Sequence, residues 1–381
     1  MKKLIFTVSF LSLALLNAAA QTTAKEWYDK GNSLKQDAKY ADAVTALKKA
    51  VSLDGSYKDA LHLLGWCYNE LGQYDNALKV LKKEATLNPV NKAANNFEIG
   101  YAYEKLKQYD DAIAKFTTVI GINNQYSLAF KERGNCYYKK KDYEKALDNF
   151  DQYTKLASNI MDPDFFHDKG WCENELGKYD DAVTSLNQSI TLDDSYIDAY
   201  SELGYAYYKL SKNDEAIANY RTAMNMSNGQ NYRYILNLAN VYYTNLKNYD
   251  SAIVYFEKGL QLQNEDKNAY YKLGWCYNDK KQYDKAISPL QKALILDPDF
   301  INAKTELGYA NYKLDRYDAA LVQFQAIMKK NPDHELSRYY AGFCYYLKND
   351  RDNLKKMIDE LTSIQTTKSL QYADTLKKYV K

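Results

Sequence analysis

The chain is poor in the residues that interrupt regular structure. Its 381 residues include only 5 Pro and 15 Gly, so turn signals between strands are few and no flexible linker is apparent. The length alone would suggest two or three ordinary domains. The composition argues instead for one regular architecture along the whole chain.

Neither sign of charge dominates. The 51 Lys and Arg residues nearly balance the 49 Asp and Glu residues, and the net charge is +2. Such a balance gives no long-range attraction for nucleic acid or for an anionic membrane. We therefore expect no nucleic-acid partner.

Residues for catalysis and metal binding are scarce as well. There are 3 His, and His62 and His167 each precede a Cys by five residues. That spacing is about 140° around a helix, so neither pair converges on a metal. No Ser-His-Asp set or Gly-rich phosphate loop is present. We expect no enzyme, no metal site and no cofactor.

An apolar run occurs only at the start of the chain. Lys2 and Lys3 precede an apolar stretch at residues 4–16, and three alanines follow at residues 18–20. This is the pattern of a secretory signal peptide, and the run is too short to span a membrane. Residues 1–20 thus predict export to the periplasm or the cell exterior, with no membrane span in the soluble mature chain.

The chain does contain an internal period of 34 to 36 residues. A small residue anchors each of ten repeats: Gly31, Gly65, Gly100, Gly134, Gly170, Gly204, Ala239, Gly274, Gly308 and Gly342. In eight repeats an alanine follows twelve residues after the anchor, and a Tyr stands at the start of most second halves.

Within a repeat, small and apolar residues recur with helical spacing, as in Leu61, Leu64, Gly65 and Tyr68. This spacing predicts two amphipathic helices whose backbones approach closely at the small residues. One such pair cannot bury its apolar face alone, but stacked pairs can. We expect aspartates at the start of the second helices to cap them: Asp75, Asp110, Asp180, Asp284 and Asp318.

The pattern resembles the tetratricopeptide repeat over residues 24–361. Together with the first twenty residues, it is similar to an exported, bacterial-type member of that family. The resemblance implies an all-α, right-handed α-solenoid of about ten helix-turn-helix repeats over residues 21–361, with a capping helix at residues 362–381.

A second period spans three repeats. The residue after the anchor runs Asn32, Trp66, Tyr101, Asn135, Trp171, Tyr205, Asn240, Trp275, Tyr309 and Phe343. Trp, Tyr and Asn thus recur in order, as if a cassette of 104 or 105 residues had been copied.

In the family this residue faces the concave groove. The resemblance therefore implies a partner-binding groove at His62, Trp66, Asn69, Glu70, Tyr101, Asn135, His167, Trp171, Asn174, Glu175, Tyr205, Tyr271, Trp275, Asn278, Asp279 and Tyr309. Rigid aromatic rings make good anchors for a partner. The alternatives are that these rings only pack between helices or form a self-association surface.

Some family members bind a C-terminal carboxylate through a clamp of Lys and Asn. Lys131 and Asn135 match its first two elements, but Asp168 stands where the clamp needs Asn. We therefore do not expect an intact clamp.

All five cysteines occupy one repeat position, two residues after the anchor: Cys67, Cys136, Cys172, Cys276 and Cys344. Other repeats place Ser, Ala or Val there, so the position requires a small, buried residue. Helices packed about 8–10 Å apart hold these Cα atoms too far apart for a disulfide.

The leading functional hypothesis is a non-catalytic scaffold that binds a peptide or a partner protein in its groove, as part of an envelope complex. The alternative is a glycan-binding module, because Trp and Tyr rings stack on sugars while Asn and acidic side chains bind hydroxyl groups.

Overall fold

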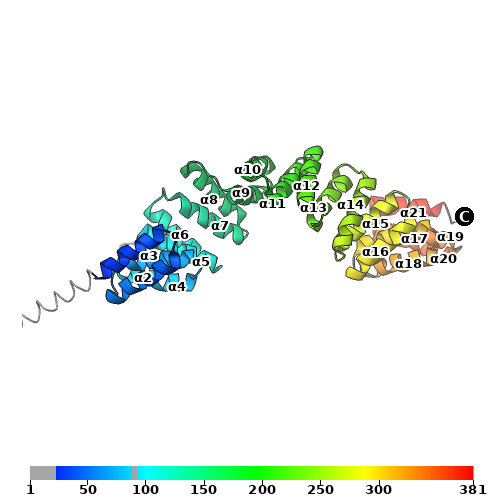
Figure 1. Ribbon diagram of the computed structural model, residues 1–381. Coiled ribbons are helices and arrows are strands. Elements are labelled where there is room, and N and C mark those ends of the chain that lie inside the picture. The colour runs from blue at the N-terminus through cyan, green and yellow to red at the C-terminus, as the bar shows by residue number, and fades with distance from the viewer. Residues whose placement is uncertain (1–22, 88–91, 381) are drawn as a thin grey trace, which may run out of the picture. The chain divides into compact units, whose positions relative to one another are not determined.

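The computed structural model describes residues 23–87 and 92–380, and all regular structure within them is helical (Figure 1). The predicted signal peptide at residues 1–20 lies outside the described residues. The chain divides into two compact units; the first ends at Lys178 and the second begins at Tyr179. This boundary falls inside the repeat anchored by Gly170.

The N-terminal unit begins with a helix at residues 23–36. It continues with α2 (Tyr40–Leu53), α3 (Lys58–Glu70), α4 (Tyr74–Leu87), α5 (Ala93–Lys105), α6 (Tyr109–Ile122), α7 (Ser127–Lys139), α8 (Tyr143–Leu156) and α9 (Pro163–Glu175). Each helix packs on the next in sequence. The first helices of successive repeats also touch, α3 with α5 and α5 with α7.

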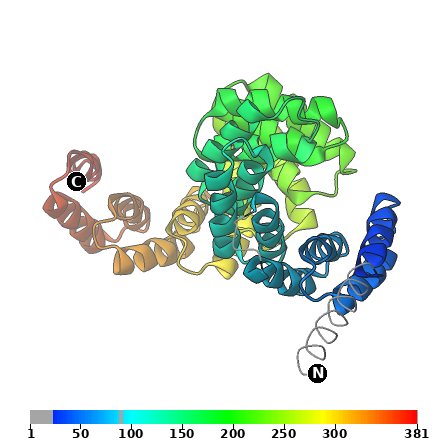
Figure 2. The ribbon, with the colours of Figure 1, turned by 90° about the vertical axis from the view of Figure 1, so that its left-hand side faces the viewer.

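The C-terminal unit has the same plan. It comprises α10 (Tyr179–Leu192), α11 (Ile197–Lys209), α12 (Asn213–Met226), α13 (Tyr232–Asn240), the π-helix η1 (Val241–Asn245), α14 (Tyr249–Leu262), α15 (Lys267–Asp279), α16 (Tyr283–Leu296), α17 (Ile301–Lys313), α18 (Tyr317–Lys330), α19 (Glu335–Leu347), α20 (Arg351–Ile364) and α21 (Thr367–Lys377). Figure 2 shows its helix pairs stacked in sequence order, from green to red. The predicted all-α solenoid of helix pairs is confirmed.

A very close contact in most helix pairs joins the anchoring glycine to a large side chain sixteen residues later. A Cβ atom on the glycine would lie less than 3.0 Å from that side chain in seven repeats. The large partners are at most 2% exposed. They are Leu47, Leu81, Phe116, Phe150, Tyr220, Leu290 and Phe324.

The predicted alanine positions are also confirmed as core. Nine alanines at this position, including Ala252 of the seventh repeat, have no exposed surface. Glycine and alanine together therefore let the two helices of a repeat approach until a ring or a branched side chain fills the space between them.

The seventh repeat departs from this pattern at two points. Its anchor is Ala239, and the large partner Phe256 follows after seventeen residues instead of sixteen. The additional residue is absorbed by η1, where the amide of Leu246 bonds to the carbonyl of Val241. Such a π-turn is the usual way for one helix to hold one more residue.

The last repeat recruits its partner from outside the repeat. A Cβ on Gly342 would lie 2.5 Å from Leu376 of α21. Helix α21 packs on α19 and α20 and begins with a capping box formed by Thr366 and Ser369. It thereby covers the apolar face that the next repeat would otherwise cover.

The prediction that aspartates cap the second helices is wrong for Asp110, Asp284 and Asp318. These helices begin one residue earlier, at a Tyr, and their N-cap residues make no side-chain cap. The aspartates lie in the first turn, where they suit the helix dipole. They pair with cations of the next repeat, as in the 3.0 Å contact of Asp284 with Arg316.

The five cysteines are unpaired and have no exposed surface. Burial raises the pKa of the Cys67 thiol to about 11 and that of Cys276 to about 12. A small, buried residue at this position is the predicted arrangement.

The glycine contact generates a stability prediction. In Gly308→Ala the new Cβ would lie 2.5 Å from the Phe324 ring, so we expect a loss of about 1–3 kcal/mol from overpacking, measured by urea unfolding followed by circular dichroism. The control is Gly121→Ala in α6, where a Cβ meets no atom within 4 Å. It should leave stability unchanged or raise it by up to about 1 kcal/mol. Equal losses in both variants would contradict the close-approach account.

The thiols generate a second prediction. Because reactivity requires an accessible thiolate, we expect a thiol reagent such as dithionitrobenzoate, at about pH 8, to leave the folded chain nearly unmodified. All five thiols should react after unfolding in guanidinium. Rapid reaction of several thiols in the folded chain would show that the position is not buried.

Candidate binding site in the C-terminal unit

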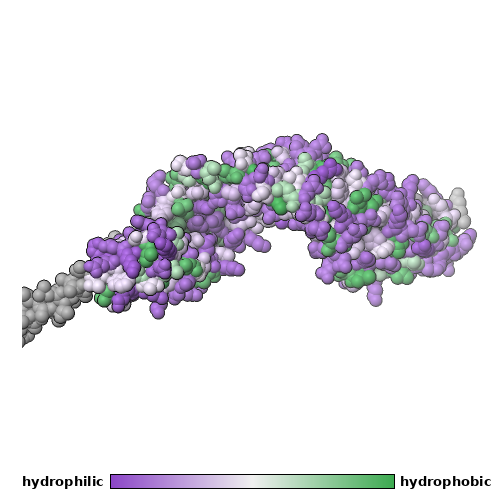
Figure 3. Space-filling model, viewed as in Figure 1, coloured by the Kyte–Doolittle hydropathy of each residue, from purple (hydrophilic) through white to green (hydrophobic). Residues whose placement is uncertain are grey.

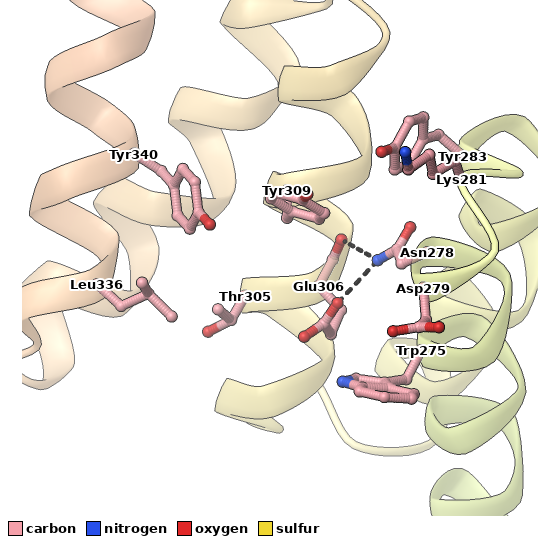
Figure 4. Close-up of a pocket in the computed structure, with 10 residues that line it drawn as sticks. All are labelled: Trp275, Asn278, Asp279, Lys281, Tyr283, Thr305, Glu306, Tyr309, Leu336 and Tyr340. Carbon is pink, nitrogen blue, oxygen red and sulfur yellow. Dashed lines mark hydrogen bonds between the residues drawn. The ribbon is translucent and has the colours of Figure 1, made fainter. Parts of the chain in front are cut away.

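A cavity of about 260 Å³ lies along three successive first helices, α15, α17 and α19 (Figure 4). It is lined by Trp275, Asn278, Asp279, Lys281, Tyr283, Thr305, Glu306, Tyr309, Leu336 and Tyr340. Three repeats are needed to build it, because each contributes side chains from the same face of its first helix. Two further lining residues, Lys281 and Tyr283, come from the turn after α15 and the start of α16.

Aromatic side chains form one part of the lining, and each is held by other rings. Trp275 meets Tyr249 edge-on with ring centroids 5.1 Å apart. Tyr309 meets Tyr283 edge-on with ring centroids 6.0 Å apart, and it meets Tyr340 at a tilt with centroids 5.3 Å apart. Trp275, Tyr309 and Tyr340 are all half-buried. They therefore expose a ring surface whose orientation is set before a ligand arrives.

The same edge-on contact recurs along the chain. The ring after the anchor packs against the Tyr that begins the second helix of the preceding repeat. The other centroid distances are 5.5 Å for Tyr40 and Trp66, 6.5 Å for Tyr74 and Tyr101, and 6.3 Å for Tyr179 and Tyr205. Each of these rings is thus packed on one side and partly exposed on the other. Packing between helices therefore does not prevent the same ring from contacting a partner.

Hydrogen-bond acceptors form the other part of the lining. The Asn278 amide nitrogen donates to the Glu306 backbone carbonyl at 3.0 Å and to its Oε2 at 2.8 Å (Figure 4). Burial raises the pKa of Glu306, and the Asn278 hydrogen bond opposes that shift. Asp279 is exposed at the rim. With Lys281 as the one cationic side chain in the lining, carboxylates outnumber cations.

In the N-terminal unit, Asn69 repeats the Asn278 arrangement. Its amide nitrogen donates to the Glu98 carbonyl at 3.1 Å and to Glu98 Oε2 at 2.8 Å. His62 lies 3.3 Å from Glu84. Asn135 donates to Glu132 at 2.9 Å. Trp66 and Tyr101 are half-buried, and Glu70 is exposed.

The remaining predicted residues vary in exposure. His167 and Asn174 are buried, Trp171 and Tyr205 are half-buried, and Glu175 is exposed. Tyr271 meets Phe300 at a tilt, with ring centroids 5.2 Å apart, and is not among the residues that line the cavity. The structure thus brings together four predicted residues at one described cavity: Trp275, Asn278, Asp279 and Tyr309. The binding role of all sixteen stays a prediction.

The carboxylate clamp is incomplete, and its Lys already has a partner. Lys131 Nζ lies 2.6 Å from Asp162 Oδ2. An anionic ligand would have to compete with this ion pair for Lys131.

Six lining residues were not predicted: Lys281, Tyr283, Thr305, Glu306, Leu336 and Tyr340. Leu336 and Thr305 precede their anchors by six and three residues. The position of Thr305 is the one that His62, His167 and Tyr271 hold in the repeats with Trp, whereas the position of Leu336 contributes no residue to the predicted groove. Glu306 and Tyr340 lie two residues before their anchors, a position that contributes no residue to the predicted groove.

Two further cavities, of about 530 and 550 Å³, are lined almost entirely by polar and charged side chains. Figure 3 shows small apolar areas scattered among polar ones. Large exposed apolar side chains such as Ile295 and Val322 lie on second helices. Within the described ranges, no group of three or more His, Cys, Asp or Glu could hold a metal ion, and no helix is long and apolar enough to cross a membrane.

Several curated proteins are similar to parts of the chain. Heat shock protein STI1 of Saccharomyces cerevisiae is 29% identical over 97 residues, which are 26% of this chain and 16% of STI1. DnaJ homolog subfamily C member 7 of Homo sapiens is 23% identical over 64% of this chain and 45% of its own length. Anaphase-promoting complex subunit 3 of Schizosaccharomyces pombe is 23% identical over 53% and 30%. The chain thus spans less than half the length of each.

Solved structures of repeat proteins are also similar to parts of the chain. YrrB, described as a TPR protein with an unusual peptide-binding site, is 25% identical, with a TM-score of 0.47 over 51% of this chain and 97% of YrrB. The C-terminal part of a TPR repeat-containing protein from Cytophaga hutchinsonii is 19% identical, with a TM-score of 0.49 over 65% and 99%.

Family models match segments of the sequence directly. Two described as tetratricopeptide repeat match residues 97–159 and 197–229, and one described as TPR repeat matches residues 173–211. A model of anaphase-promoting complex, cyclosome, subunit 3 matches residues 36–119 and 245–327. Since these segments coincide with stacked helix pairs of constant length, the chain is a tetratricopeptide-repeat protein.

Proposed function

We propose that this protein is a non-catalytic scaffold and that it binds a peptide segment of a partner protein at the cavity along α15, α17 and α19. The observation that carries the proposal is the lining itself: half-buried rings from three repeats surround carboxylates and a buried amide. A surface of this composition suits the side chains and backbone amides of a peptide.

The energetic argument concerns rigidity. Trp275 and Tyr309 are already held by edge-on contacts with other rings, so they lose little conformational entropy when a ligand packs on them. Large aromatic residues in such settings commonly dominate binding energy. A cavity of about 260 Å³ accommodates one or two side chains, with the rest of the peptide lying along the first helices.

The relatives support a role in assembly. One of them is subunit 3 of the anaphase-promoting complex, a protein that works as part of a larger complex. We extend this to the present chain as an assembly role outside the cytoplasm, in an envelope complex, because residues 1–20 have the pattern of a signal peptide.

A selection from a random-peptide phage library against the intact chain tests the proposal. Peptides that bind the wild-type chain should lose at least tenfold in affinity for Tyr309→Ala, since an aromatic anchor contributes more than about 1.4 kcal/mol. The matched control is Ile295→Ala on α16, which removes a side chain that is 76% exposed and should leave affinity unchanged.

Two results would contradict the proposal. One is a selection that yields no specific peptide. The other is a set of peptides whose affinity falls equally for Tyr309→Ala and Ile295→Ala. Titration of the same variants with soluble polysaccharides, followed by tryptophan fluorescence, tests the glycan alternative. That alternative predicts a fluorescence change with a sugar and none with the selected peptides.

A further inference from the structure

Four glutamates occupy one position of the repeat, two residues before the anchor: Glu98, Glu132, Glu202 and Glu306. Three of them, Glu98, Glu202 and Glu306, lie in repeats whose residue after the anchor is Tyr. Comparing their surroundings shows what the cavity lacks.

Glu202 receives a cation from its own chain. Arg233, six residues before the anchor of the next repeat, places Nη2 2.7 Å from Glu202 Oε1. Glu202 is 6% exposed, so this guanidinium neutralises a carboxylate that has been taken almost entirely out of water.

Glu306 has no such cation. The residue equivalent to Arg233 is Leu336, and Leu336 lines the cavity. Among the described residues Glu306 forms no ion pair; its hydrogen-bond donor is Asn278. Burial without a nearby cation leaves the pKa of Glu306 raised. Figure 4 shows the Glu306 carboxylate beside Asp279 and Trp275.

We infer that Glu306 binds a cationic side chain, arginine or lysine, from the partner's peptide, in the place that Arg233 takes at Glu202. This inference rests on the proposed function, because it specifies what the same cavity recognises. An arginine fits best, since its planar guanidinium donates two parallel hydrogen bonds to one carboxylate.

The rest of the lining is complementary to a cation. Asp279 adds a second carboxylate at the rim, and Trp275 and Tyr340 offer ring faces. Lys313 already lies 5.4 Å from the Tyr309 ring centroid, so we place the incoming charge at Glu306 and not over that ring. Lys281 is the one cationic side chain in the lining. Its charge repels an incoming cation and so weakens the attraction that Glu306 and Asp279 exert.

The surroundings of Glu98 resemble those of Glu306, but they favour a bound cation less strongly. Leu128 takes the equivalent position there, and Asn69 donates to Glu98 as Asn278 does to Glu306. Lys35 and His62 nevertheless lie close enough to lower the pKa of Glu98, against the effect of burial. We therefore expect a cationic ligand to bind at Glu306 more tightly than at Glu98.

The test uses two capped tripeptides that differ only in charge: acetyl-Gly-Arg-Gly-amide and its neutral isostere with citrulline in place of arginine. The readout is the indole N–H signal of Trp275 in the intact ¹⁵N-labelled chain. The chain has 4 Trp, so Trp275→Phe identifies the signal. The arginine peptide should shift this signal at concentrations at least tenfold lower than the citrulline peptide.

Two variants test the role of Glu306. Glu306→Gln should remove the preference for arginine, and Leu336→Arg should abolish binding by supplying the cation internally, as Arg233 does. Glu202→Gln is the matched control and should leave the Trp275 response unchanged. An unchanged thermal midpoint in each variant shows that folding is not the cause.

Equal shifts with both tripeptides, no shift with either, or a Glu306→Gln response like that of the wild type would overturn the inference. Peptides from the library that depend on Tyr309 but contain no arginine or lysine would overturn the cation alone and leave the scaffold function standing. A library that yields no binding peptide removes both.

Discussion

The close approach of two helices at a glycine is the constraint on which this structure depends. Because the glycine lacks a Cβ, a leucine, phenylalanine or tyrosine from the second helix fits against the first helix backbone. The contact recurs at the same point of successive repeats and is almost fully buried. It therefore sets the spacing of the helices in seven pairs and, through stacking, the spacing of the first helices that build the cavity.

The exceptions follow from the same constraint. Where Ala239 replaces the glycine, the helix carries a π-turn and the large side chain comes one residue later. In the repeat anchored by Gly342, α21 supplies the large partner, Leu376, from outside the helix pair. Helix α21 thereby covers an apolar face of that repeat.

Much of the fold was predictable because it depends on local periodicity. The anchors, the two helices per repeat and the buried cysteine position all follow from spacing within one repeat. The ion pairs of Asp110, Asp284 and Asp318 were missed because their partners belong to the following repeat. So were Glu306 and Tyr340, since a cavity built by three helices depends on how neighbouring repeats pack. Arg233 and Leu336 occupy equivalent positions in the sequence. The difference between them becomes informative only because the structure shows the Arg233 guanidinium bound to Glu202.

The central claim is that the faces of the first helices bind a partner, while the second helices serve as structural support. Photo-cross-linking in the native host tests it most directly, with benzoylphenylalanine at position 309 on α17 or at position 295 on α16. We expect a discrete adduct from position 309, attached within a few residues of an arginine or lysine of the partner, and none from position 295. Equal adducts from both positions, or adducts from position 295 alone, would contradict it.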